Sequence, residues 1–374
     1  MKKLIFSIML SFSAASIASA QNNVCSVKGE MIGIGDSLIV RSNGNNDTIL
    51  VKNNKFSFTL NIAQPQNIYV LTPAALRGEN RKYNSFVAVP GEKAELKGDI
   101  TKRYDITGSK FYNEYHEADL MLEGVKKETN DYVNGLKKRL DAGEKRDDVM
   151  KEYQERMPEL TKKVNNAIID FIKAHPDYEA NAAIIGELDG IEAMEQAVGY
   201  LSENVKNGRM KPVYEESINK IKKELAMEEE AAKKQAAGVE ATDFTLNDIN
   251  GKPFTLSSLR GKYVLLDFWG SWCGWCIKGM PQMKEYYAKY KGKFEIVGVD
   301  CRDTPEKWKA AVEKHQLPWI HVYNAKGDTD VCVPYAIQGY PTKILIGPDG
   351  KIVKTIIGED PAFYTFLDET FGGK

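Results

Sequence analysis

One pair of cysteines, separated by two residues, constrains this chain more than any other feature. The segment Trp272-Cys273-Gly274-Trp275-Cys276 follows the apolar run Tyr263–Trp269. If a helix begins between the cysteines, its unpaired N–H groups and the positive end of its dipole favour Cys273 as a thiolate. A thiolate that attacks a disulfide, with a second thiol beside it, is a complete device for thiol–disulfide exchange.

The first 20 residues are typical of a secretory signal peptide. A basic start, Lys2-Lys3, precedes the apolar segment Leu4–Ile17, and Ala18-Ser19-Ala20 forms a small-residue cleavage site. The apolar segment is short for a membrane span. Cys25 does not directly follow the cleavage site, so we expect no lipid anchor. We therefore expect a periplasmic protein, in a compartment where disulfides form and persist.

The composition limits the number of domains and the kinds of partner. A chain of 374 residues has room for two or three domains of about 100–200 residues each. Its net charge of −1 lacks the basic excess of nucleic-acid-binding proteins, so we expect no nucleic-acid partner. Four of its five cysteines lie in the C-terminal third, at Cys273, Cys276, Cys301 and Cys332.

Residues 21–108 have the pattern of a β-rich domain, in which short segments alternate between polar and apolar residues and are separated by Asn- and Gly-containing turns. The predicted strands are Ser37–Val40, Asp47–Val51, Lys55–Leu60, Ile68–Leu71, Ser85–Val89 and Ala94–Leu96. A small antiparallel sandwich or partial barrel fits this spacing. It contains no catalytic constellation, so we interpret it as a structural or recognition domain.

Residues 109–237 are highly charged and predict a helical region. Apolar residues at alternating steps of three and four indicate one long helix, at Met150, Tyr153, Met157, Leu160, Val164, Ala167 and Phe171. Pro158 predicts a kink or a boundary within it. An internal helical hairpin is the favoured arrangement, and a coiled coil between two copies, giving a homodimer, is the alternative. Ala236-Ala237-Gly238 ends the region.

Residues 238–374 alternate between strands and helices. A hairpin joins Phe244–Leu246 to Phe254–Leu256, and the continuous apolar strand Tyr263–Trp269 is typical of a buried central position. A helix from about residue 275 to 290 follows the cysteines. The later elements are strand Phe294–Val299, helices Pro305–Lys314 and Thr329–Ile337, hairpin strands Thr342–Ile346 and Lys351–Ile357, and helix Phe363–Phe371. This order predicts an α/β fold with a mixed sheet flanked by helices.

Residues 237–374 resemble the thioredoxin fold at four points. These are the two cysteines after a strand, Asp267 six residues before Cys273, Pro281 five residues after Cys276, and the segment Gly339-Tyr340-Pro341-Thr342. The leading hairpin resembles the periplasmic thioredoxin-like branch, TlpA/ResA-like and related to the AhpC/TSA group. That branch includes membrane-anchored thiol reductants of cytochrome c maturation, and secreted members with accessory regions before the thioredoxin-like module.

The resemblance implies a role for each of four candidate catalytic residues. Cys273 is the exposed thiol and the nucleophile that forms a mixed disulfide, and Cys276, one turn deeper, resolves it. Asp267 is a buried carboxylate whose raised pKa lets it take the proton of the resolving thiol. The alternative for Asp267 is a strand-end residue bonded to backbone. Pro341 follows a cis peptide bond and packs against the disulfide, and the backbone of Tyr340 pairs with a bound substrate.

The residues around and between the cysteines suggest how substrates dock and which way electrons flow. Trp272 and Trp275 are expected to form an exposed aromatic rim, with core packing as the alternative, stronger for Trp272. Gly274-Trp275 replaces the Gly-Pro of thioredoxin, and no histidine occupies this loop. The missing histidine favours a reductant or isomerase over a strong oxidant.

Cys301 and Cys332 are a second candidate pair. Cys301 follows a predicted strand, and Cys332 lies in the predicted helix before Pro341. In the thioredoxin fold both places are on the active-site side of the sheet, so we hypothesise a second disulfide, structural or able to relay electrons. We expect no metal, because structural zinc usually needs two Cys-x-x-Cys pairs. We expect no cofactor other than the redox-active disulfide.

Three functions remain under consideration. The leading hypothesis is an extracytoplasmic thiol-disulfide oxidoreductase that acts on protein thiols and disulfides and exchanges electrons with a membrane donor. A thiol peroxidase would need a Pro-x-x-x-Thr/Ser-x-x-Cys motif, and the corresponding turn instead holds Trp272 and the two cysteines. A nonenzymatic binding or assembly protein would use the N-terminal region for recognition.

Overall fold

The computed structural model describes residues 23–80, 82–327 and 329–372. The predicted signal peptide, residues 1–20, lies outside this part. The chain forms two compact units that divide between Lys222 and Lys223, within helix α8 (Lys211–Lys234). The predicted domain boundaries after residues 108 and 237 stay predictions.

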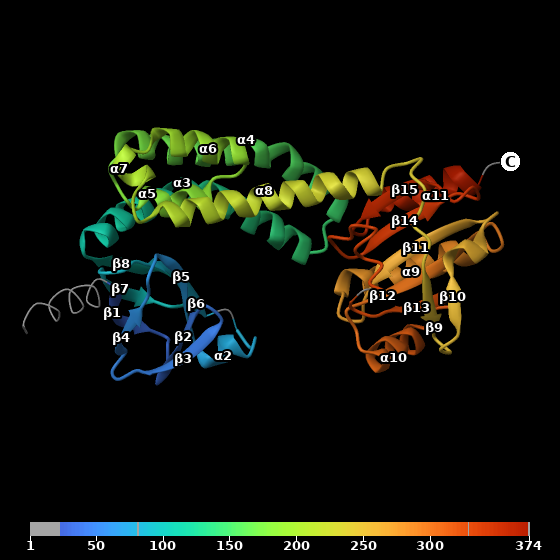
Figure 1. The fold of residues 1–374 in the computed structure, drawn as a ribbon, viewed down its shortest axis with the longest axis horizontal. Helices are drawn as coiled ribbons and strands as arrows, with labels where there is room; N and C mark the ends of the chain where they lie inside the picture. Colours follow the sequence, from blue (N-terminus) through green and yellow to red (C-terminus); the bar gives the residue numbers. More distant parts are fainter. Residues whose placement is uncertain (1–22, 81, 328, 373–374) are drawn as a thin grey trace, which may run out of the picture. The chain divides into compact units, whose positions relative to one another are not determined.

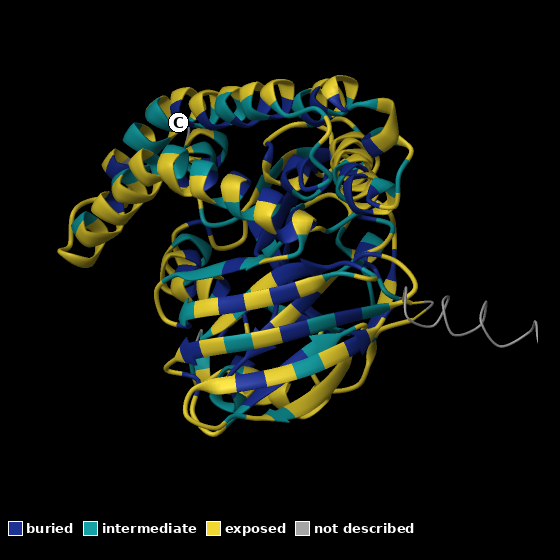
Figure 2. Ribbon diagram, turned by 90° about the vertical axis from the view of Figure 1, so that its left-hand side faces the viewer, coloured by how far each residue is buried: buried dark blue, intermediate teal, exposed yellow. Residues whose placement is uncertain are grey.

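The first unit begins with two four-stranded sheets (Figure 1). One has the order β4-β1-β7-β8 and the other the order β3-β2-β5-β6. Their strands are β1 (Val24–Ile32), β2 (Ser37–Ser42), β3 (Asn45–Leu50), β4 (Lys55–Asn61), β5 (Gln66–Leu71), β6 (Tyr83–Ala88), β7 (Lys93–Asp99) and β8 (Tyr104–Gly108). Buried and exposed residues alternate along many of these strands (Figure 2), so each sheet turns one apolar face inward.

The β region confirms the six predicted strands and adds two, β1 and β8. One detail differs from the predicted antiparallel arrangement, because β1 pairs with β7 in parallel. The chain between β1 and β7 first builds the other sheet and β4, and it then returns to lie beside β1 in the same direction. The other strand pairs described in these two sheets are antiparallel. The short helix α2 (Pro73–Leu76) is capped by the Thr72 hydroxyl.

Two long helices, α3 (Lys110–Asp141) and α4 (Arg146–Ala174), form the favoured internal hairpin. Helix α4 continues through Pro158, so the predicted boundary there is wrong. In the predicted stripe only Leu160 and Val164 are buried, and Ile168 and Ile172 complete the buried face instead. This shift follows from the helical period of 3.6 residues per turn. Positions chosen at alternating steps of three and four residues repeat every 3.5 residues on average, so they move gradually around a straight helix. Pairing of two copies stays a prediction.

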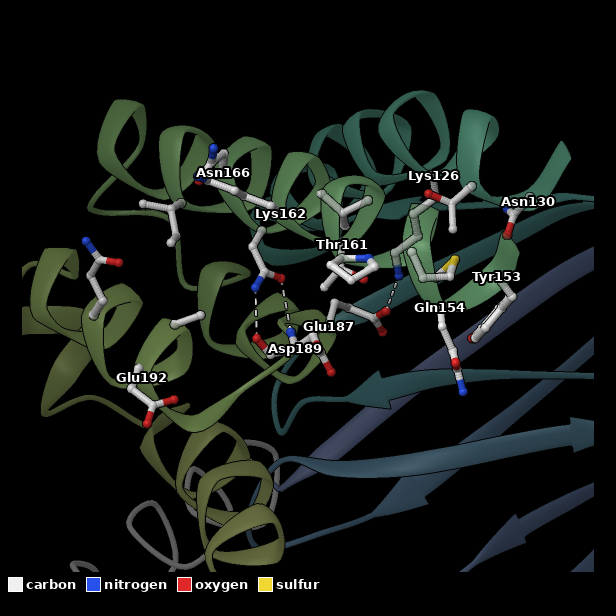
Figure 3. A pocket seen from close by; sticks show the side chains of 18 residues that line it. Lys126, Asn130, Tyr153, Gln154, Thr161, Lys162, Asn166, Glu187, Asp189 and Glu192 are labelled. Atoms are coloured by element: carbon white, nitrogen blue, oxygen red, sulfur yellow. Dashed lines mark hydrogen bonds and ion pairs between the residues drawn. The ribbon is translucent and has the colours of Figure 1, made fainter. Parts of the chain in front are cut away.

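The remaining helices of the first unit are short apart from α8. They are α5 (Asn181–Ile184), the 3-10 turn η1 (Ile185–Glu187), α6 (Ile191–Tyr200) and α7 (Glu203–Lys206). An open groove of about 910 Å³ lies among α3, α4 and α6 (Figure 3). The ion pair of Lys126 with Glu187 and the hydrogen bonds of Asn165 with Asp189 cross it. No histidine or cysteine is among the described residues that line it.

The second unit is a seven-stranded mixed sheet in the order β10-β9-β13-β12-β11-β14-β15. Its strands are β9 (Thr245–Asp248), β10 (Pro253–Thr255), β11 (Tyr263–Trp269), β12 (Phe294–Cys301), β13 (Ile320–Asn324), β14 (Thr342–Ile346) and β15 (Ile352–Ile357). The three strands β11, β12 and β13 are parallel, and the others pair in antiparallel fashion. This confirms the predicted mixed sheet, although β13 was not predicted.

Apolar clusters cover both faces of this sheet. Leu265 and Trp269 of β11 belong to one cluster, whereas Val264, Leu266 and Phe268 belong to the other. Burial on both faces explains why β11 reads as a continuous apolar run. The helices are α9 (Gly274–Lys289), α10 (Pro305–His315) and α11 (Pro361–Phe371), with a 3-10 turn η2 (Leu256–Leu259).

The predicted helix Thr329–Ile337 is wrong, because the described residues of this segment form turns. Pro334 lacks an N–H group and disfavours helical geometry at the preceding residue. Side chains also take the place of helical acceptors, since the backbone N–H of Val331 donates to Asn324 and that of Cys332 donates to Asp330. Cys332 therefore lies in a turn that the side chains of its neighbours hold in place.

Candidate active site

The two cysteines lie where the central strand passes into a helix. Strand β11 ends at Trp269, and Cys273 is the N-cap of α9. The backbone N–H of Cys276 donates to Cys273 Sγ over 3.1 Å. Cys273 and Cys276 are joined by a disulfide, with their Cα atoms 5.3 Å apart. The predicted helix start between the cysteines is confirmed, and the first sulfur is the one that receives a helix N–H group.

In this disulfide form both cysteines are buried. Cys273 is 5% exposed and Cys276 is 3% exposed, so the expectation of an exposed Cys273 is wrong for the oxidised site. The disulfide holds Cys273 Sγ against Cys276 at the first turn of the helix. Cys273 Sγ therefore has little contact with solvent. Trp272 and Trp275 are 49% and 48% exposed, as expected for an aromatic rim.

An aromatic cluster links three segments beside the disulfide. The Trp272 indole N–H donates to the Cys301 carbonyl over 2.9 Å, and the Trp272 ring meets the Tyr340 ring edge to face at 5.2 Å. The Arg302 guanidinium lies 5.9 Å from the Trp272 ring centre and 5.1 Å from that of Tyr340, within cation–π range. The Tyr340–Pro341 peptide is cis, as the resemblance implies. Sequence reasoning did not identify Arg302.

Beneath the sheet surface, Asp267 belongs to a buried charged network. Asp267 on β11 lies opposite Lys343 on β14, and the Lys343 ammonium is 3.6 Å from its carboxylate. The same ammonium donates to Glu359 over 2.6 Å. Lys343 is fully buried and Asp267 is only 4% exposed. Two carboxyl groups therefore share one ammonium inside the protein, an arrangement that the strand-end alternative for Asp267 does not describe.

Burial controls the protonation of both carboxyl groups. It raises the pKa of Asp267, and the nearby Lys343 opposes this only in part. Burial likewise raises the pKa of Glu359, again against the influence of Lys343. Two carboxylates beside a single cation favour a state in which one of them holds a proton. The raised pKa expected for Asp267 is therefore present, and Glu359 is a second carboxyl with the same property.

Glu359 also contacts the helix that carries the cysteines. Its carboxylate fills the space that a side chain at Gly279 would need. Gly279 is buried on α9, three residues after Cys276. A Cβ atom at Gly279 would lie 2.3 Å from the Glu359 carboxyl carbon, so any larger residue here would have to displace this carboxylate. Sequence reasoning missed Glu359, for which no motif exists. Lys343 could have been found from the sequence, because it is a lysine within the otherwise apolar strand Thr342–Ile346.

A second set of contacts fixes the loop before the cysteines. The backbone N–H and the hydroxyl of Ser271 both donate to the Asp303 carboxylate, each over 2.6 Å. Asp303 lies between β12 and α10, so the loop is tied to the end of the neighbouring strand. Close by, burial raises the pKa of Asp300 to about 8.

The second cysteine pair is brought together as the sequence suggests. Cys301 Sγ and Cys332 Sγ are 3.4 Å apart, and both are free thiols. A disulfide between them stays a prediction. Within the described ranges, no group of three or more His, Cys, Asp or Glu side chains is arranged to hold a metal ion. No helix of this described part is long and apolar enough to span a bilayer.

A mixed sheet with two cysteines after its central strand, a helix starting between them and a cis-proline loop nearby defines a thioredoxin-like module. The model of the AhpC/TSA family matches residues 237–355. The chain is 42% identical over 127 residues to the thiol-disulfide oxidoreductase ResA of Bacillus cereus, an alignment that covers 34% of this chain and 72% of that protein. It is 39% identical over 124 residues to ResA of Bacillus subtilis, covering 32% and 67% respectively.

Among solved structures, the thioredoxin domain of a thiol-disulfide oxidoreductase from Bacteroides vulgatus is 36% identical, with a TM-score of 0.34. That comparison covers 36% of this chain and 98% of the other. The sequence matches carry the assignment: this chain belongs with the ResA-like thiol-disulfide oxidoreductases of the thioredoxin superfamily, and its residues 237–355 match the AhpC/TSA family. The family match lies in the unit that holds Cys273 and Cys276.

Replacing Lys343 tests whether one ammonium holds two buried carboxyl groups. Lys343→Met removes the cation and leaves Asp267 and Glu359 without a charged partner. We expect a loss of about 3–5 kcal/mol in the free energy of unfolding at neutral pH. Urea denaturation followed by circular dichroism measures it. Lys351→Met, at an exposed position on the same hairpin, is the control, and equal losses in both variants would contradict the network.

The raised pKa of Asp267 predicts a pH dependence of stability. The native state keeps this proton at pH values where the unfolded chain, with a pKa of about 3.9, has released it. The stabilisation is therefore complete below the unfolded pKa and is lost as the pH rises through the folded pKa. Asp267→Asn removes this titration, so we expect a shallower decline in stability between about pH 4 and pH 8.

The free energy of unfolding of the Asp267→Asn variant, relative to that of the native protein, should therefore rise between about pH 4 and about pH 8. Urea midpoints at the two pH values provide the measurement. Glu285→Gln, which alters an exposed carboxyl on α9, should leave the pH profile unchanged. A parallel pH profile for Asp267→Asn and the native protein would show that Asp267 does not titrate in this way.

Proposed function

We propose that this chain is an extracytoplasmic enzyme that exchanges disulfides with protein substrates through Cys273 and Cys276. The observation that carries the proposal is the position of Cys273 at the N-cap of α9, where its sulfur accepts the Cys276 N–H. In the reduced protein the same N–H and the helix dipole stabilise a thiolate at Cys273. The disulfide in the structure is the oxidised product of the same cycle.

The proposed cycle begins with the reduced dithiol. The Cys273 thiolate attacks one sulfur of a substrate disulfide, which forms a mixed disulfide and releases the other substrate sulfur as a thiolate. Cys276 then loses its proton and attacks Cys273 Sγ, which releases the second substrate thiolate. The substrate gains two electrons, its two thiolates take up the proton lost by Cys276 and one proton from solvent, and the enzyme is left with the Cys273–Cys276 disulfide. Run in reverse, the same steps oxidise a substrate dithiol.

The buried network has a role in the second step of this cycle. Cys276 is buried, so its thiol needs a base to become a nucleophile. Asp267 is the proposed acceptor of that proton, because its raised pKa makes it a better base than a solvated carboxylate. Lys343 holds Asp267 and Glu359 in place, and Glu359 contacts the same helix at Gly279. We assign Lys343 and Glu359 as positioning residues.

The aromatic rim is the proposed docking surface for the substrate. Trp272 and Trp275 are half exposed on either side of Cys273, and Gly274 between them presents backbone without a side chain. The backbone of Tyr340, next to cis Pro341, is the proposed partner for a substrate strand. Lys278 lies over the Trp275 ring at 5.2 Å, which adds positive charge to this edge. A folded or partly folded protein is the substrate that such a surface suits.

We further propose that the enzyme works as a reductant or isomerase and is recharged by a membrane electron donor. The absence of a histidine between the cysteines supports this direction. The signal-like residues 1–20 support a periplasmic location. Secreted proteins with disulfides are the proposed substrates, and apocytochrome c is one candidate, as the thioredoxin-like branch suggests.

A trapping experiment tests the proposal. Cys276→Ala removes the resolving thiol, so Cys273 should remain linked to its substrates in cells, and mass spectrometry identifies them. The double variant Cys273→Ala/Cys276→Ala is the control and should capture none. The native protein should reduce insulin disulfides in vitro, and Cys273→Ala should not. No captured partner together with no reductase activity would refute the proposal.

A further inference from the structure

The thiols of Cys301 and Cys332 contact one another and are separate from the Cys273–Cys276 disulfide. Cys301 is the last residue of β12, and Cys332 lies in the turn that replaces the predicted helix. Their sulfur atoms are 3.4 Å apart. A disulfide brings two sulfurs to about 2.05 Å, so a small movement of the side chains would join them.

The two thiols differ in their access to solvent. Cys301 is buried, whereas Cys332 is partly exposed. Both line a pocket of about 470 Å³, a volume suited to a small molecule. Arg302, Lys326, Asp330 and Tyr340 supply polar side chains to the pocket, and Val333 and Ile337 supply apolar ones. A reagent in this pocket meets the sulfur of Cys332 more readily than that of Cys301.

The hydrogen bonds around the pair also distinguish the two sulfurs. Cys332 Sγ has the Asn324 amide nitrogen at 3.4 Å and the Tyr340 hydroxyl at 3.6 Å, in addition to the Cys301 thiol. The hydrogen bond between the two thiols lowers the pKa of Cys332. The same hydrogen bond, together with burial, raises the pKa of Cys301. The accessible sulfur is therefore the one that favours the thiolate, and the buried sulfur keeps its proton.

We propose that Cys332 and Cys301 form a second dithiol centre, in which Cys332 attacks a low-molecular-weight disulfide in this pocket and Cys301 resolves the product. In the first step the Cys332 thiolate bonds to one sulfur of the small disulfide and releases the other as a thiolate. The Cys301 proton passes to that leaving thiolate. The Cys301 thiolate then attacks Cys332 Sγ, which closes the Cys301–Cys332 disulfide and releases the second small thiolate, and this thiolate takes a proton from solvent. The small disulfide is reduced to two thiols, and the pair is oxidised.

The second dithiol centre shares contact residues with the Cys273–Cys276 site. The Cys301 carbonyl accepts the Trp272 indole N–H, and the Tyr340 hydroxyl contacts Cys332 Sγ. Trp272 and Tyr340 are the residues proposed to dock substrates beside Cys273. The second centre does not depend on the proposed function of Cys273 and Cys276, so it can be tested with both of those residues replaced.

The test uses the full chain with Cys273→Ser and Cys276→Ser, which leaves Cys25, Cys301 and Cys332. The reduced protein is treated with hydroxyethyl disulfide, and intact mass and peptide mapping follow the products over time. We expect a transient adduct on Cys332, followed by a Cys301–Cys332 disulfide without the adduct. Cys332 should react at least about tenfold faster than Cys25, a buried thiol with a raised pKa that serves as an internal control.

Two further variants separate the roles of the thiols. Adding Cys301→Ser should stop the reaction at a stable adduct on Cys332. Adding Cys332→Ser, or Cys332→Ala as a second replacement, should leave Cys301 unmodified, with circular dichroism confirming the fold. Modification of Cys301 in the absence of Cys332, a persistent Cys332 adduct while Cys301 is present, or equal rates at Cys332 and Cys25 would each overturn the proposal.

Discussion

The hydrogen bond from the Cys276 N–H to Cys273 Sγ is the contact on which the proposed chemistry of this protein depends. It exists because β11 ends at Trp269 and α9 begins at Gly274, which places Cys273 at the N-cap. A sulfur in this position receives a backbone N–H group that the helix itself cannot satisfy. The apolar clusters on both sheet faces hold the strand and helix that create the position, and the Ser271–Asp303 hydrogen bonds fix the loop between them.

Below this contact, the protein keeps charged groups where apolar side chains would pack more simply. Asp267, Lys343 and Glu359 are all largely buried, and burying charges costs free energy that their mutual attraction offsets only partly. The surplus carboxyl has a raised pKa, which suits a group that receives and releases a proton. In the proposed cycle this arrangement costs some stability and keeps a carboxyl of raised pKa on the strand that leads to the cysteines.

Much of the catalytic unit could be predicted from the sequence, because its signals are local. The apolar run of β11, the cysteine spacing and the Gly339–Thr342 segment each identify an element within a few residues. The helix predicted at Thr329–Ile337 is wrong, because Pro334 and the acceptors Asn324 and Asp330 impose turns there. Glu359 could not be predicted, since its approach to Gly279 depends on how a distant loop meets the helix.

The central claim is that the start of α9 makes Cys273 the reactive thiolate. The most direct test is the pH dependence of the alkylation rate of Cys273 in the fully reduced protein, followed by mass spectrometry of the labelled peptide. We predict that Cys273 reacts before Cys276, with an apparent pKa clearly below the ordinary cysteine value of about 8.5. An apparent pKa at or above that value, or earlier labelling of Cys276, would contradict it.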